Sequence, residues 1–152
     1  MASPLTLLMP VLPGITPEAI AGGMAQYGPQ LNEALNNIGT VHYARTLILD
    51  PRAPNLQPSA ASTSFVLGIV TEFDGSFDEY IQDFVNVVGP VFDALLQFVV
   101  GGAAVTPVAD HVAAFEAFLK ENDASQHPPN GGLFQAYTAT VQTIIASIPP
   151  ST

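Results

Sequence analysis

The chain repeats one pattern of apolar and polar positions, an apolar strand followed by an amphipathic helix. The first copy has an apolar run at 6–11 and a helical stretch containing Gly28-Pro29. The second has an apolar run at 65–73 and a helical stretch containing Gly89-Pro90. The second Gly-Pro pair follows the first by 61 positions, from 28 to 89. A strand–helix unit used twice, with a further strand after each helix, predicts a βαββαβ plan.

Both long helices carry recognisable start signals. Thr16 is a predicted N-cap followed by Pro17 at the first helical position, and Ser76 with Glu79 forms a capping box for the second helix. The apolar positions of each helix recur every three or four residues, which predicts one buried face. Because Gly and Pro lower helix propensity, we expect a kink or break in the first helix near residue 28.

The remaining segments complete the expected element order. A stretch rich in β-branched and aromatic residues predicts a strand at 40–49, and a Pro- and Ser-rich loop at 50–62 precedes the next strand. A third helix is expected at about 109–121, a short closing strand at 133–137 and a terminal helix at 141–148.

These elements predict a single domain, 1–152, of the α+β class. Its ferredoxin-like βαββαβ plan has a four-stranded antiparallel sheet, with extra helices near the C-terminus. The two long helices would cover one sheet face and leave the other bare. Since an apolar sheet face is not left exposed, we expect a homodimer that associates face to face.

Composition narrows the possible partners. Three basic residues against thirteen acidic ones give a formal charge of −10, which disfavours nucleic acid and anionic membranes, because both need clustered Lys and Arg. The chain has no cysteine, which excludes disulfides, thiolate metal sites and a cysteine nucleophile. No apolar run approaches the length of a membrane span, and the first residues do not have the character of a signal peptide, so a cytoplasmic protein is expected.

Three short motifs carry a resemblance to a known family. They are His42-Tyr43-Ala44-Arg45 on a predicted strand, Phe73-Asp74-Gly75-Ser76, and Tyr80-Ile81-Gln82-Asp83-Phe84. With them the chain resembles the dimeric α/β-barrel superfamily, and within it an uncharacterised branch with a His-aromatic-Ala-Arg strand. The superfamily holds haem-binding peroxidases, chlorite-degrading enzymes, cofactor-free monooxygenases and stress-response proteins without known catalysis.

The strongest candidate site is the hairpin formed by the strands at 40–49 and 65–73. If Leu49 opposes Phe65, paired positions sum to 114, and His42, Ala44, Thr46 and Ile48 share one face with Glu72, Val70, Gly68 and Val66. The opposite face carries Val41, Tyr43, Arg45, Leu47 and Leu49 and is bulky enough to be the helix-facing core. Small side chains around one His-Glu pair predict a cavity inside a dimer. A one-residue slip of the register would remove this arrangement.

His42 is the first candidate catalytic residue. It could act as a general base held in one tautomer by Glu72, or as a haem-iron ligand. The alternative is a structural histidine hydrogen-bonded at the dimer interface.

Arg45 could orient an anion or a peroxide beside His42. The alternative is a buried ion pair with Glu72, Asp74 or Asp83. The hydroxyls of Tyr43 and Tyr137 could point toward a ligand, although aromatic core is the commoner fate of such residues.

No metal site is expected from the sequence. Asp78, Glu79 and Asp83 lie at the start of the second long helix, where acidic residues complement the helix dipole without a metal. His111 and His127 are too isolated to converge as zinc ligands.

The sequence therefore predicts a protein that binds a small, largely apolar organic molecule, with monooxygenase- or peroxidase-like oxidation as its chemistry. The expected catalytic residues are His42, Arg45 and Glu72, and the expected ligand-binding residues are Tyr43, Thr46, Gly68, Val70 and Tyr137. No cofactor is expected, with haem as the alternative. A non-catalytic stress-response or accessory homodimer is the competing prediction.

Overall fold

Three antiparallel strands form the sheet, in the order β1-β3-β2. In the computed structural model, which describes residues 2–149, β1 spans Ala2–Pro10, β2 spans Val41–Leu49 and β3 spans Val66–Asp74. The helix between β1 and β2 carries the chain past the position that β3 later fills, which is the split βαβ arrangement. β3 is therefore the central strand, paired on both sides.

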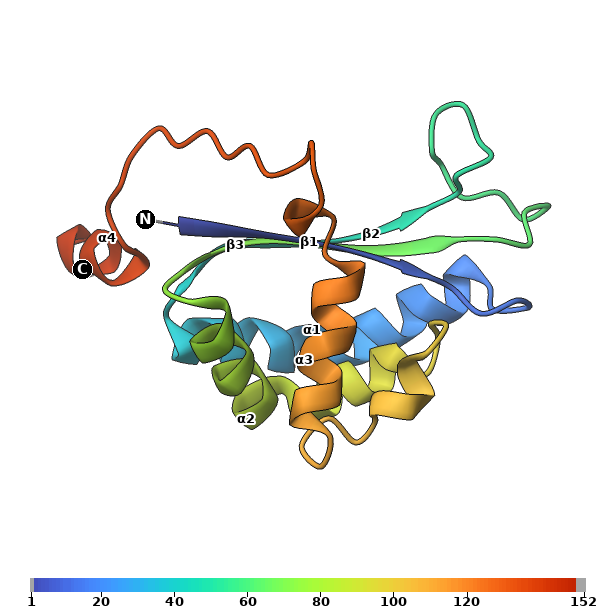
Figure 1. Cartoon of the computed structure of the whole chain (residues 1–152), viewed down its shortest axis with the longest axis horizontal. Coiled ribbons are helices and arrows are strands. Elements are labelled where there is room, and N and C mark those ends of the chain that lie inside the picture. The colour runs from blue at the N-terminus through green and yellow to red at the C-terminus, as the bar shows by residue number, and fades with distance from the viewer. Residues whose placement is uncertain (1, 150–152) are drawn as a thin grey trace.

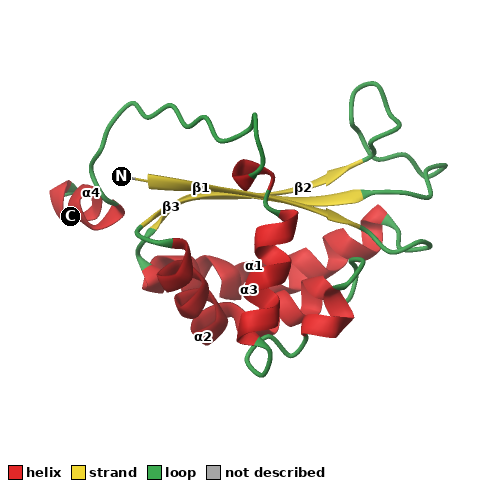
Figure 2. Ribbon diagram, viewed as in Figure 1, coloured by secondary structure: helices red, strands yellow, loops and turns green. Residues whose placement is uncertain are grey.

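The helices divide unequally between the two sheet faces. Their bounds are α1 Pro17–Ile38, α2 Phe77–Leu96, α3 Val112–Asn122 and α4 Val141–Ser147. Figures 1 and 2 show α1, α2 and α3 on one side of the sheet, whereas the segment that leads to α4 crosses the other side. That second side is the open face of the sheet.

Local signals in the sequence correctly predicted how the long helices begin. The Thr16 hydroxyl accepts a hydrogen bond from the Ala19 N–H, and Ser76 with Glu79 forms the complete capping box. Of the kink or break expected near residue 28, the break is wrong, because α1 continues through Pro29 as α2 does through Pro90. Packing of both halves of each helix on the same core offsets the hydrogen bond that each proline removes.

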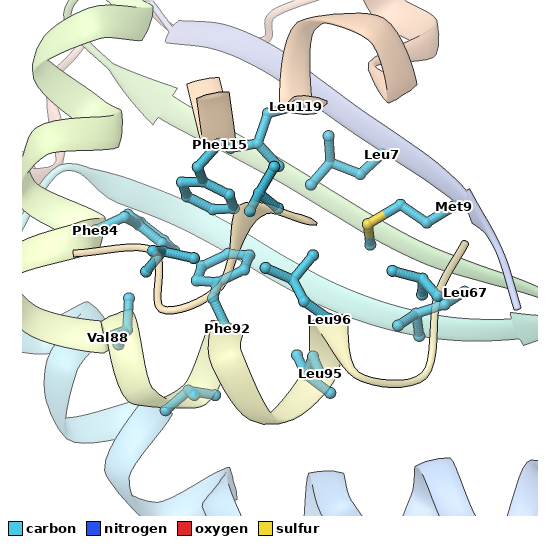
Figure 3. Packing of buried hydrophobic residues seen from close by; sticks show 14 of the residues in the cluster. Leu7, Met9, Leu67, Phe84, Val88, Phe92, Leu95, Leu96, Phe115 and Leu119 are labelled. Atoms are coloured by element: carbon cyan, nitrogen blue, oxygen red, sulfur yellow. The ribbon is translucent and has the colours of Figure 1, made fainter. Parts of the chain in front are cut away.

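The core lies between the sheet and the three helices beneath it. Leu7 and Met9 of β1 and Leu67 of β3 are almost fully buried, and Figure 3 shows them facing side chains of α2 and α3. At the other end of β3 the Phe73 ring stacks on Tyr80 of α2, with ring centroids 3.9 Å apart. Each such side chain contributes roughly 1.5–3 kcal/mol through burial, so the end of β3 is firmly held against α2.

The expected four-stranded ferredoxin-like sheet is wrong, because the structure has three strands and residues 133–137 form none. The outer edge of β1 explains the difference. The Thr6 N–H points to that edge, and since backbone groups alternate along a strand, those of Pro4 and Pro10 would point there too, but proline has no N–H.

Hydrogen bonds with two side chains and one backbone amide partly replace the missing strand. Asp123, which forms an isolated bridge with Leu7, accepts the Thr6 N–H through Oδ1 at 2.8 Å. The Ser125 hydroxyl donates to the Pro4 carbonyl at 3.1 Å, and the Val100 N–H donates to the Pro10 carbonyl at 2.8 Å. The edge of β1 is thus covered by short contacts instead of a strand.

A β-bulge at His42 changes which residues of β2 share a face. Val41 pairs with Phe73 as expected, but Tyr43 pairs with Glu72, so His42 is the extra residue. From Tyr43 onward the register is shifted by one position. The open face of the sheet therefore carries four residues of β3 and four of β2, namely Glu72, Val70, Gly68 and Val66 with Tyr43, Arg45, Leu47 and Leu49. The predicted assignment of the four β2 residues to the core is wrong.

Over residues 2–149, no helix combines the length and apolar character needed to cross a lipid bilayer.

Candidate functional site

The C-terminal arm, residues 127–149, crosses the open face of the sheet and ends in α4, which buries none of its residues. Part of this arm, residues 133–139, forms a strap over the His42 end of the sheet. A cavity of about 190 Å³ lies between them, with His42, Tyr43 and Glu72 on the sheet side and strap residues on the other. We call it the strap cavity.

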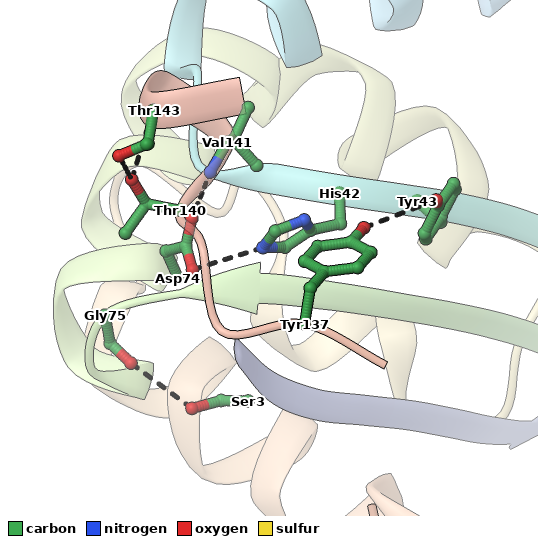
Figure 4. A network of polar contacts seen from close by, with 9 residues as sticks. All are labelled: Ser3, His42, Tyr43, Asp74, Gly75, Tyr137, Thr140, Val141 and Thr143. Atoms are coloured by element: carbon green, nitrogen blue, oxygen red, sulfur yellow. Dashed lines mark hydrogen bonds and ion pairs between the residues drawn. The ribbon is translucent and has the colours of Figure 1, made fainter. Parts of the chain in front are cut away.

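Asp74 connects the sheet to the arm. Its Oδ1 lies 3.1 Å from His42 Nε2, and its Oδ2 accepts the backbone N–H of Val141 at 2.8 Å (Figure 4). The side chains of His42 and Asp74 are only 6% and 13% exposed. Both acceptor atoms of this carboxylate are therefore used, one for the imidazole and one for the first residue of α4.

The pKa of the Asp74 carboxyl reflects these contacts. Desolvation by itself would raise the pKa, but the hydrogen bonds from Val141 and His42 outweigh it and hold the pKa below its usual value. An ionised carboxylate can only accept, so His42 donates through Nε2. In the neutral ring Nδ1 then remains as the proton acceptor.

Glu72 contributes an unused acceptor to the same site. Its Oε2 is buried and has no hydrogen-bond partner. Desolvation raises the pKa of the Glu72 carboxyl, and the nearby His42 ring opposes the rise only in part. The expected His42–Glu72 pair is not formed, because the bulge places Tyr43 opposite Glu72 and turns His42 toward Asp74.

Two tyrosines join β2 to the strap. The hydroxyls of Tyr43 and Tyr137 share a hydrogen bond of 3.5 Å, and the Tyr137 ring centroid lies 6.0 Å from that of His42. Figure 4 shows Tyr137 in front of the His42 ring. Both tyrosines line the strap cavity, although Tyr137 comes from an irregular segment and not from the expected strand.

The structure separates Arg45 from His42. Arg45 lies on the open face opposite Val70, and with Glu72 it lines a neighbouring hollow of about 350 Å³. It does not line the strap cavity. Within residues 2–149 the expected ion pair with Glu72, Asp74 or Asp83 is not formed, since the Arg45 guanidinium has no carboxylate within ion-pair distance.

The other predicted ligand-binding residues fall in different places. Thr46 lies on the helix side of the sheet and lines a separate, mainly apolar cavity of about 220 Å³ between the sheet, α1 and α2. Gly68 and Val70 are on the open face beyond the strap. At Gly68 an added Cβ would lie 3.4 Å from Leu47 Cβ and 3.7 Å from Leu8 Cδ2, so these two leucines flank the space above the glycine.

Asp74 is the principal residue that sequence reasoning missed as part of the site. Two signals were available, since Asp74 lies in the Phe-Asp-Gly-Ser motif and follows Glu72 by two positions on one strand, which places both on one face. The contribution of Val141 could not be read from the sequence, because it depends on the path of the arm.

The residues around His42 do not fit a haem. A cavity of about 190 Å³ is below the roughly 300–1,000 Å³ of pockets for drug-sized ligands, and within the described part of the chain no Lys or Arg lines it to balance propionates. Among the described residues, no group of three His, Asp or Glu side chains converges as a metal site would require.

No protein-family model matches the chain, and neither a curated protein nor a solved structure matches it.

Proposed function

We propose that the protein binds a small organic molecule in the strap cavity and that it does so as a homodimer. The observation that carries the proposal is the buried, unpaired Oε2 of Glu72 at a cavity lined by tyrosine rings. A buried acceptor without a partner costs about 1–3 kcal/mol. A ligand with one hydrogen-bond donor on an apolar body offsets that cost.

The size of the cavity limits the ligand. An enclosed apolar cavity of about 150 Å³ holds benzene, so the strap cavity, at about 190 Å³, suits a benzene ring with a short substituent. Tyr43 and Tyr137 supply ring faces for such a body, and Glu72 supplies the polar contact that fixes its orientation.

His42 supports proton-transfer chemistry on the bound molecule. Asp74 holds the ring through Nε2, which leaves Nδ1 as the basic atom, an arrangement that general bases share. The oxidative chemistry implied by the resemblance to the dimeric α/β-barrel superfamily would begin with removal of a ligand proton by His42, and molecular oxygen would be the oxidant of the resulting anion. Glu72 would orient the ligand, and Arg45 remains a candidate for orienting an anion in the neighbouring hollow.

The apolar part of the open face supports the homodimer. Leu8 is 39% exposed, and it flanks Gly68 together with Leu47, beyond the reach of the strap. A second copy that covered this surface would remove it from water without touching the arm.

A non-catalytic accessory homodimer is the second candidate. It is favoured by the way both oxygens of Asp74 are used in holding the arm and His42. In that case the His42–Asp74 pair is structural, and any ligand is bound without being changed.

A cavity-filling variant tests binding. Isothermal titration calorimetry with a panel of singly substituted benzenes should detect at least one ligand of wild type. Ala136→Phe, which adds a ring to a residue that lines the cavity, should abolish that binding, whereas Ala146→Phe on the exposed surface of α4 should not. Equal affinity in all three proteins would contradict the proposed site.

A further inference from the structure

We infer that the strap cavity selects ligands that carry a protonated amine, an arylalkylammonium being the class that fits it. This inference rests on the proposed function and specifies the chemistry of the ligand. It follows from three features of the cavity, namely the charge of the groups around it, the aromatic rings that line it and the unpaired oxygen of Glu72.

The charges around the cavity favour a cation. Glu72 lines it directly, and Asp74 lies behind His42, with its carboxylate held ionised by two hydrogen bonds. Among residues 2–149, no Lys or Arg lines the cavity. Arg45 is the nearest basic residue on this sheet face, and it borders the adjoining hollow. An anionic ligand would meet two carboxylates, whereas a cation would be attracted by both.

The aromatic residues around the cavity also favour an ammonium group. Tyr43, Tyr137 and Phe134 all line it, and Phe134 is 97% exposed, at the rim. Ring faces attract cations by about 0.5–1 kcal/mol at exposed sites and more where water is excluded. They also pack against the ring of an arylalkylamine, so the same residues serve both parts of the ligand.

The unpaired Oε2 of Glu72 distinguishes a primary or secondary ammonium from a quaternary one. Oε2 has almost no accessible surface, so a ligand N–H reaches it only after the Glu72 side chain rotates toward the cavity that it lines. The hydrogen bond is then charge-assisted and roughly twice as strong as a neutral one. A quaternary ammonium has no such proton. The geometry therefore points to an amine with at least one N–H.

The pH dependence follows from the groups that face the ligand. His42, Glu72 and the two tyrosines lie around it, with Asp74 behind His42. Binding of the ammonium requires ionised Glu72, so affinity should fall as the pH drops through the Glu72 pKa, which desolvation raises. A neutral ligand of the same shape should show little of this dependence.

Matched ligands and matched variants provide the test. 2-Phenylethylamine and 2-phenylethanol differ in the charged group and are titrated calorimetrically at pH 7 against wild type, Glu72→Gln and Glu79→Gln. Glu79→Gln is the control, because Gln preserves the capping box of α2 and residue 79 does not line the cavity.

We expect wild type and Glu79→Gln to bind the amine about tenfold more tightly than the alcohol, a difference of about 1.4 kcal/mol. Glu72→Gln should lose this preference for the amine, and a far-ultraviolet circular dichroism spectrum equal to that of wild type shows that the variant folds. Equal binding of amine and alcohol by wild type would overturn the inference and leave the proposed function in place. If neither 2-phenylethylamine nor 2-phenylethanol binds, and no other neutral member of the benzene panel binds either, the inference about the amine and the proposed function are both overturned.

Discussion

Oδ2 of Asp74, at the end of β3, accepts a hydrogen bond of 2.8 Å from the backbone N–H of Val141, which lies 67 residues further along the chain. The other oxygen of the same carboxylate contacts His42. One side chain therefore orients the candidate base and fastens the arm that closes the cavity. The position of the strap and the chemistry of His42 are coupled through Asp74.

Removal of this carboxylate should release the arm. In Asp74→Ala the Val141 N–H and the His42 ring lose their shared acceptor, and we expect a loss of about 1–3 kcal/mol. For a domain of this size that corresponds to about 2–4 °C in Tm for each kcal/mol. Hydrogen–deuterium exchange should quicken in residues 133–147 more than in β1 or β3. Glu33→Ala, which removes an exposed carboxylate on α1, should leave the exchange unchanged. Exchange in the arm that stays as slow in Asp74→Ala as in wild type would show that Asp74 does not hold the arm.

The attachment of the arm should depend on pH with a definite sign. The pKa of Asp74 is lowered from its usual value of 3.8 in the folded protein, so its contribution to stability is present above that value and is lost as the pH falls through the lower folded pKa. Glu72 acts in the opposite sense, since its pKa is raised from 4.5 and stability is gained as the pH falls through the raised value.

Glu72→Gln removes the pH dependence that Glu72 contributes and leaves that of Asp74. In this variant the rate at which a protease cleaves the arm should therefore be constant from pH 7 to about 4 and should increase only in stronger acid. If the cleavage rate already increases between pH 7 and 5, a group other than Asp74 holds the arm on the sheet.

His42→Ala distinguishes a ligand-binding histidine from a structural one. In the proposed function the variant keeps its Tm within about 2 °C, because Asp74 retains its hydrogen bond from Val141, but it loses turnover of the ligand or affinity for it. If His42 is only structural, Tm falls by an amount equivalent to about 1–3 kcal/mol with no ligand dependence in either protein. Thermal melts of wild type and variant, with and without 2-phenylethylamine, separate the two results.

Local signals made much of the fold predictable. The N-cap at Thr16 and the capping box at Ser76 depend only on neighbouring residues, and both were correctly predicted. The missing fourth strand was harder to predict, although Pro4 and Pro10 are visible in the sequence. Their effect depends on which edge of β1 their backbone nitrogens face, and that is fixed only by pairing with β3.

The candidate site was only partly predictable, because it too depends on how the strands pair. The strap cavity does bring together four of the predicted residues, His42, Tyr43, Glu72 and Tyr137. The predicted hydrogen-bond partner of His42 and the predicted face of Thr46 were wrong. A single bulged residue caused both errors, since a one-residue shift moves every later side chain of β2 to the other face. Alternation of residue types along β2 does not reveal where such a bulge falls.

The homodimer can be tested at the open face. Light scattering at micromolar concentration should give the mass of a dimer for wild type. Leu8→Glu should weaken association by about a hundredfold or more, because a buried unpaired charge costs several kcal/mol. Val87→Glu, at a 44% exposed position on α2, is the matched control and should remain dimeric. A monomeric wild type would contradict the homodimer directly.

The ligand is proposed to lie between the strap and the open face of the sheet, and an NMR titration of the isotope-labelled protein locates it. Addition of 2-phenylethanol should shift backbone signals of Ala136, Tyr137 and Tyr43, with smaller changes elsewhere, since these residues line the strap cavity. Shifts confined to Thr46 and Leu31, which line the cavity on the helix side, would instead place the ligand beneath the sheet and contradict the account.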